Sequence, residues 1–231
     1  KIKRVDSYNY YLADCFFSMN ILIIAPHPDD EVLGMGGTIK KISKKNNVSL
    51  LVMTDGASAQ YSDPKMIHVR KESCKKSSKI LGISKIEFLD FPDMKLDLMP
   101  QIEINKEIEK VIKKIKPKIV FTSPKNDLNR DHEITFNSTL VAARPNSSKV
   151  KSVFSYELPG HVKMPFLPNH FEDVTKQFEY KIKAFKMYKS EVMKFPHPRS
   201  IKAIENLAGY RGVQAGLLQA EAFETVHEIV T

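Results

Sequence analysis

The chain has 231 residues, a formal net charge of +9 and 42% hydrophobic residues. This length and hydrophobic content suit one domain with a full core and argue against a disordered or fibrous chain. No apolar run approaches the ~20 residues that a membrane-spanning helix needs. Its two cysteines, Cys15 and Cys74, provide neither a disulfide framework nor a thiolate metal site. We therefore expect a cytoplasmic protein.

The first 18 residues carry charges but lack the continuous apolar core of a signal peptide. Met19 opens a segment that resembles a natural beginning. We interpret residues 1–18 as an upstream extension or a cloning remnant, with a native N-terminal arm as the alternative. Residues 19–231 are predicted to form a single domain.

The predicted elements alternate along the first two-thirds of the chain. In order they are a strand at 20–25, a helix at 32–45, a strand at 48–54, a helix at 64–81, a strand at 86–90, a helix at 101–115, a strand at 118–122, a helix at 131–143 and a strand at 151–157. Residues 158–169 are predicted to be a loop, and 174–192 and 201–231 to be helical. This pattern favours an α/β protein with a Rossmann-like, three-layer α/β/α fold, a mostly parallel sheet and a C-terminal helical extension.

The positive charge is carried mainly by lysines on the predicted amphipathic helices. Such runs are usually solvated helix faces. Arginine, the better reader of bases and phosphates, is scarce, and no aromatic residues are interleaved with the lysines. We therefore expect no nucleic-acid partner, while an anionic small substrate fits the charge.

Three polar clusters follow predicted strands, at 26–31, 54–56 and 126–132. Ligands of an open α/β sheet bind beyond the carboxyl ends of its strands, so these clusters are expected to converge on one rim. His27 and Asp30 are spaced to bind one metal ion from the first turn of a helix. Catalytic zinc typically has three protein ligands, so a third is needed. His132 is the best-placed candidate, because it lies at the start of the helix that follows the fourth predicted strand. Asp29 would then be the general base.

Each of these residues also has a simpler interpretation. A histidine before proline is often only a loop residue, and three acidic residues at a helix start complement the helix dipole. Asp131 could be the N-cap of its helix. Because the three clusters all follow predicted strands and converge on one rim, we favour a functional site over these simpler interpretations.

The segment from Ile23 to Gly34, with its His-Pro-Asp-Asp-Glu core, closely resembles the opening motif of the PIG-L/LmbE-like de-N-acetylase family. The resemblance runs in order through the whole chain from Met19 onward, at 54–56, 70–72, 91–93, 127–132, 143–145, 156–157, 196–200, 211–212 and 220–223.

The resemblance implies a Rossmann-like zinc-dependent hydrolase that removes acetyl groups from N-acetylglucosamine-type sugars or glycoconjugates. Its zinc ligands would be His27, Asp30 and His132, and Asp29 its general base; Fe²⁺ or another divalent metal is the alternative cofactor. The family's sugar-contacting residues correspond to Arg70 and Asp93.

One position departs from the family pattern. Asn129 stands where many members have a histidine that is thought to stabilise the oxyanion, so an amide hydrogen bond would take over that role. Asp131 is expected either to hold the ring of His132 or to cap its helix.

Two other functions fit the same residues. Two histidines and a carboxylate also form the facial triad of a mononuclear iron oxygenase. A catalytically silent, metal-containing sugar-binding module would explain the missing histidine. We favour the hydrolase, which releases acetate and a free amine, because Asp29 is left beside the ligands for proton transfer. The sequence leaves a homo-oligomer open.

Overall fold

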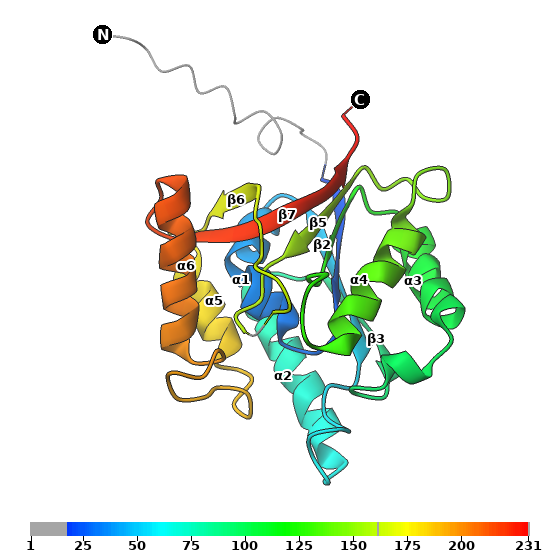
Figure 1. Cartoon of the computed structure of the whole chain (residues 1–231), viewed down its shortest axis with the longest axis horizontal. Helices are drawn as coiled ribbons and strands as arrows, with labels where there is room; N and C mark the ends of the chain where they lie inside the picture. The colour runs from blue at the N-terminus through cyan, green and yellow to red at the C-terminus, as the bar shows by residue number, and fades with distance from the viewer. Residues whose placement is uncertain (1–17, 161, 231) are drawn as a thin grey trace.

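A computed structural model describes residues 18–160 and 162–230 (Figure 1). The predicted extension 1–18 lies outside the described residues, apart from Ser18. Seven strands of the described chain form one sheet in the order β3-β2-β1-β4-β5-β7-β6. They are β1 (Asn20–Ala25), β2 (Asn47–Thr54), β3 (Lys85–Phe91), β4 (Ile119–Thr122), β5 (Ser152–Tyr156), β6 (His170–Asp173) and β7 (Ala220–Glu228).

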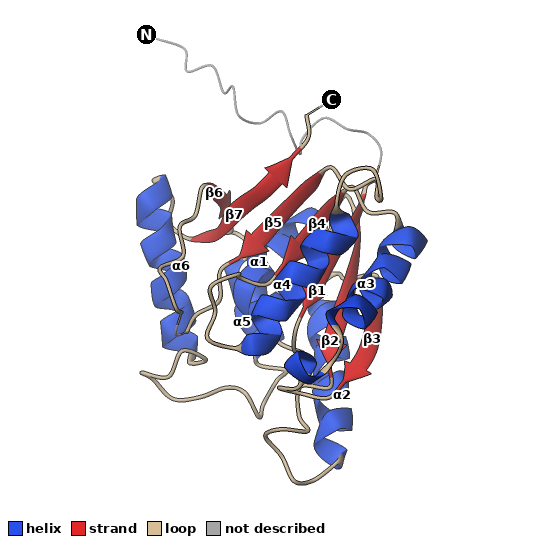
Figure 2. Cartoon of the chain, turned by 45° about the vertical axis from the view of Figure 1, so that its right-hand side comes forward, coloured by secondary structure: helices blue, strands red, loops and turns tan. Residues whose placement is uncertain are grey.

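The first five strands pair in parallel. Strand β7 pairs antiparallel with both β5 and β6. The helices are α1 (Asp30–Ile42), α2 (Lys65–Leu81), α3 (Gln101–Ile115), α4 (Arg130–Ala143), α5 (Phe178–Phe185) and α6 (Ile201–Ala215), with a short 3₁₀ helix η1 (Leu96–Leu98). Figure 2 shows α3 and α4 together on one face of the sheet. The helices α1, α2, α5 and α6 cover the opposite face, so the predicted three-layer α/β fold is confirmed.

Each face of the sheet has its own hydrophobic core. Val32, Cys74 and Phe185 belong to the core beneath α1, α2 and α5. Ile108 and Ile134 belong to the core beneath α3 and α4. Each such side chain, when fully buried, stabilises the fold by roughly 1.5–3 kcal/mol. β1 and β4 lie in the middle of the sheet and contribute to both cores, which explains their continuous apolar sequences.

The C-terminal third differs from the predicted loop followed by two helices. The helix predicted over 174–192 is confined to α5, and the helix predicted over 201–231 ends at Ala215. Two strands, β6 and β7, were not predicted. Alanine and glutamate in β7 suggest a helix, but pairing with β5 and β6 overrides that local preference. The C-terminal segment therefore extends the sheet as well as adding helices.

The connections of the sheet define where a site can form. β1 lies between β2 and β4, and the chain crosses from one face of the sheet to the other between these neighbours. This is the topological switch point at which α/β proteins bind ligands, beyond the carboxyl ends of the strands. Within the described ranges, no helix combines the length and apolar character needed to cross a membrane.

Candidate metal centre

The loop after β1 is fixed by its neighbour β2. The backbone N–H and the hydroxyl of Thr54 both donate to the carbonyl of Pro26, each at 2.9 Å. Gly56 has a φ of +61°, and a Cβ there would lie 2.3 Å from Cδ of Pro28. Only glycine meets both requirements, so Gly56 lets the second loop pack directly on the first.

Asp29 has a φ of 130°, a strained conformation for a residue with a side chain. Its backbone N–H donates to Oε2 of Glu31 at 3.0 Å, and Oε1 of Glu31 accepts from the hydroxyl of Tyr188 at 2.6 Å. Burial of Glu31 raises the pKa of its carboxyl to about 7. Glu31 therefore holds the Asp29 backbone in place.

The structure brings the three predicted metal ligands together. Nδ1 of His27 lies 3.1 Å from Oδ2 of Asp30 and 3.1 Å from Nε2 of His132. The third side of the triangle, from Nε2 of His132 to Oδ2 of Asp30, is 3.3 Å. All three residues are buried, and their donor atoms could hold one metal ion.

The geometry of this triangle fits tetrahedral zinc. With bonds of about 2.0–2.1 Å, a tetrahedral zinc ion holds its ligand atoms about 3.3 Å apart. The observed separations of 3.1–3.3 Å agree with that value. Two imidazoles and one carboxylate are also a typical catalytic zinc set, which leaves a fourth position open.

The charges of the three side chains shift one another's pKa values. Burial alone would lower the pKa of His132, but the charge of Asp30 and the hydrogen bond that His132 donates to Asp127 raise it to about 9. Burial would raise the pKa of Asp30, but His132 and His27 hold it well below its usual range. A metal ion bound here must therefore displace a proton.

Two buried carboxylates fix the ring of His27 from behind. Nε2 of His27 lies 3.2 Å from Oδ1 of Asp93 and 3.3 Å from Oδ2 of Asp131. A hydrogen on Nε2 can bond to Asp131, with Asp93 close by, and leaves the Nδ1 lone pair facing the other ligands. Asp93 has no exposed surface. The contact between Asp93 and a sugar hydroxyl stays a prediction.

The partner of His132 is Asp127, not the predicted Asp131. Nδ1 of His132 lies 3.0 Å from Oδ2 of Asp127. Asp131 instead points toward His27 and accepts from the backbone N–H of Met94 at 2.8 Å. The N-cap of α4 is Asn129, whose Oδ1 accepts from the N–H of Asp131 at 2.9 Å. The predicted capping role of Asp131 is therefore wrong, because Asn129 occupies that position.

Asp29 belongs to a cluster of buried charges. Burial raises the pKa of its carboxyl, although the nearby guanidiniums of Arg70 and Arg199 oppose this. Arg70 is 1% exposed, donates to Asp29 and forms a 2.6 Å ion pair with Glu191. The sugar contact of Arg70 stays a prediction.

Sequence reasoning missed Asp127 and Glu191. Asp127 lies in the polar cluster at 126–132, and its spacing of five residues from His132 is the signal that could have identified it. Glu191 lies in a lysine-rich stretch predicted to be helical, and nothing around it indicated a buried site. Only the folded chain places it beside Arg70.

The fold and this site define a class of protein, the metal-dependent hydrolases with a Rossmann-like α/β fold. Comparisons with known proteins agree. The family PIG-L: GlcNAc-PI de-N-acetylase matches residues 22–143, so the chain belongs to the PIG-L family.

Relatives and solved structures point the same way. A diacetylchitobiose deacetylase of Thermococcus kodakarensis is 29% identical, over 89% of this chain and 82% of that protein. The uncharacterized deacetylase YaiS of Escherichia coli is 30% identical, over 74% of this chain and 90% of that protein. The structure of N,N'-diacetylchitobiose deacetylase from Pyrococcus horikoshii superposes with a TM-score of 0.79 and 26% identity, covering 94% of this chain and 88% of that one.

The chain is accordingly a hydrolytic N-deacetylase that acts on amide bonds. This confirms the predicted family, fold and reaction type. The iron oxygenase and the silent binding module gain no support from the comparisons. The family is metal-dependent, and the chain has a matching group of histidine and aspartate side chains.

Proposed function

We propose that the protein is a zinc enzyme that removes the acetyl group from an N-acetylglucosamine-type sugar or glycoconjugate. The observation that carries this proposal is the buried triangle of His27, Asp30 and His132, whose edges match tetrahedral zinc. The sugar is supported by the named relatives, which are diacetylchitobiose deacetylases and probable N-acetyl-alpha-D-glucosaminyl L-malate deacetylases.

His27, Asp30 and His132 would hold the zinc ion. Zinc bound there supplies Lewis acidity toward both the attacking water and the amide carbonyl. Asp93 and Asp131 keep the Nδ1 lone pair of His27 directed at the site.

Asp29 is proposed to move the protons. Its carboxyl is 1% exposed, and burial raises its pKa above the usual value, which favours a group that takes up a proton during the reaction. It accepts a proton as water attacks the amide carbon, and it then donates that proton to the departing amine. Acetate and a free amino sugar result.

Asn129 is proposed as a donor to the oxyanion. Its Oδ1 caps α4, and no hydrogen bond among the described residues uses its amide nitrogen. That nitrogen can therefore donate to charge developing near His132, as amides do in oxyanion holes.

An acetate-release screen tests the proposal. Zinc-loaded protein is mixed with free, nucleotide-linked, lipid-linked and thiol-linked N-acetylglucosamines and with diacetylchitobiose. We expect acetate and a free amine in equal amounts from at least one of them, and no release after chelation. Release from none of these sugars, together with release from a simple N-acetyl amine, would show that the sugar assignment is wrong.

A further inference from the structure

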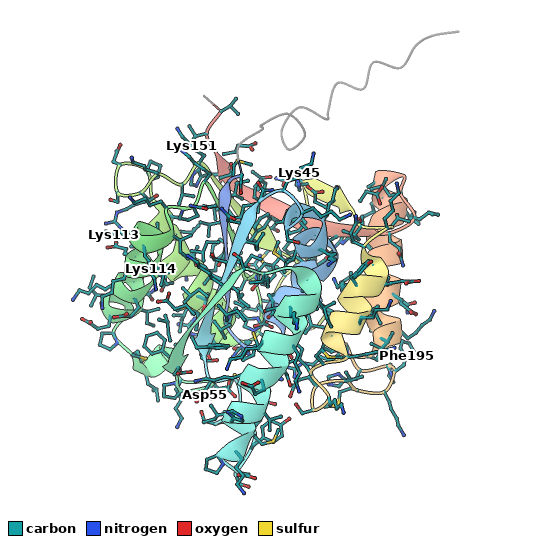
Figure 3. All side chains as sticks on the ribbon, turned by 180° about the vertical axis from the view of Figure 1, so that it is seen from behind. Lys45, Asp55, Lys113, Lys114, Lys151 and Phe195 are labelled. Carbon is teal, nitrogen blue, oxygen red and sulfur yellow. The ribbon has the colours of Figure 1, made fainter. Side chains whose placement is uncertain are left out.

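Four charged side chains form a cluster beside the candidate metal centre: Asp29, Arg70, Glu191 and Arg199. Asp29 follows β1 and Arg70 lies in α2, whereas the other two lie in the segment 186–200 that joins α5 to α6. Figure 3 shows Phe195, from this segment, at the same end of the molecule as Asp55, which follows β2. Lys151 and Lys45 mark the opposite end. The joining segment thus reaches the carboxyl ends of the strands.

The bonds of Arg70 in this cluster are unequal. Its Nη1 lies 2.6 Å from Oε1 of Glu191. The two contacts with Asp29, from Nη1 to Oδ2 and from Nη2 to Oδ1, are both 3.5 Å. Charge-assisted hydrogen bonds to carboxylates are usually about 2.7–2.9 Å. Arg70 therefore makes its short bond with Glu191 and keeps a distance from Asp29.

Arg199 shows the same preference. Its Nη1 pairs with Oε2 of Glu191 and stands 4.0 Å from Oδ2 of Asp29. Glu191 is itself fixed, because its Oε1 also accepts from the hydroxyls of Tyr61 at 3.1 Å and Ser190 at 2.9 Å. With 1% of its side chain exposed, Glu191 has no freedom to leave the two guanidiniums.

We propose that Glu191 is a positioning residue, which draws Arg70 and Arg199 away from Asp29 and leaves the Asp29 carboxylate free to accept a proton. The inference rests on the proposed role of Asp29 as general base. A carboxylate in a bidentate salt bridge has both oxygens occupied by fixed donors. Without the charge of Glu191, Arg70 would close on Asp29 and form that salt bridge.

The variant Glu191→Gln tests this, because it keeps the shape of the side chain and removes its charge. In zinc-loaded protein we expect kcat to fall about 100-fold, within the range that general acid–base catalysis contributes, while KM and zinc content stay close to wild type. Glu191→Asp, which keeps the charge, should retain more of kcat. A crystal structure of Glu191→Gln should show the contacts between Arg70 and Asp29 shortened from 3.5 Å.

A matched control and a milder variant complete the experiment. Glu172 is a buried carboxylate of β6 that pairs with Lys41 at 2.6 Å, so Glu172→Gln should leave kcat unchanged. Tyr61→Phe removes one donor to Glu191 and should lower kcat severalfold at constant KM. It serves as the test if Glu191→Gln does not fold.

Three results would overturn the inference: wild-type kcat in Glu191→Gln, a rise in KM without a fall in kcat in either variant, or unchanged distances between Arg70 and Asp29. If wild-type protein releases no acetate from any substrate, the proposed function fails instead. The distances in Glu191→Gln still test the role of Glu191 in that case.

Discussion

Glu31 should make the stability of the metal-free protein depend on pH in a way that one substitution removes. Its carboxyl is fully buried, and burial raises its pKa from 4.5 to about 7. A raised pKa in the folded state means that the stabilising contribution is complete below pH 4.5 and is lost as the pH rises through 7. The difference between the two pKa values corresponds to about 3 kcal/mol of unfolding free energy.

The glutamine of Glu31→Gln stays neutral at every pH, so the variant lacks this pH-dependent contribution to the unfolding free energy. Urea unfolding followed by circular dichroism, with a chelator present, would be measured for wild type and variant at about pH 4.5 and about pH 8. We expect the stability of wild type relative to the variant to fall by about 3 kcal/mol between these two conditions. Titrations common to both proteins cancel in this comparison.

Glu172→Gln provides a control of opposite sign. Burial alone would raise the pKa of Glu172, but hydrogen bonds from His170 and Lys41 hold it below its usual range. Glu172 therefore stabilises the folded protein at a pH above the pKa that it has in the unfolded chain. This stabilisation is lost as the pH falls through its lower pKa in the folded protein. A constant difference between wild type and Glu31→Gln across the pH range would refute the reasoning about Glu31.

Three further substitutions probe the site and the fold. Asp29→Asn should lower kcat by about 10²–10⁴-fold and leave zinc content unchanged, as measured by acetate release and metal analysis. Asp127→Asn removes the partner of His132, and zinc titration should show affinity reduced about 10–100-fold. Gly34→Ala would place a Cβ 2.4 Å from the ring of Tyr156, so thermal unfolding should show a loss of about 1–3 kcal/mol.

Much of the fold could be predicted because its local signals agree with its tertiary structure. α3 has the predicted bounds of 101–115, since its apolar stripe is regular and prolines flank it. β7 could not be predicted, because its alanine and glutamate residues favour a helix and only pairing with neighbouring strands makes it extended. Long-range pairing of this kind leaves little trace in local sequence.

The site shows the same division. The convergence of His27 and His132 follows from the rule that parallel strands present their carboxyl ends at one edge. The sequence does not predict that Asp127 contacts His132 while Asp131 contacts His27. The direction of these side chains depends on how the start of α4 packs against η1 and β1. Glu191 lies 162 residues from Asp29 in the printed sequence, and no spacing rule connects them.

The central claim is that one zinc ion, held by His27, Asp30 and His132, drives the hydrolysis of a sugar acetamide. The most direct test titrates zinc into metal-free protein and follows acetate release from diacetylchitobiose or another substrate found in the screen. The account predicts that activity rises in proportion to zinc and saturates at about one ion per chain, as expected for a single three-ligand site. Full activity in metal-free protein, or saturating zinc without any acetate, would contradict it.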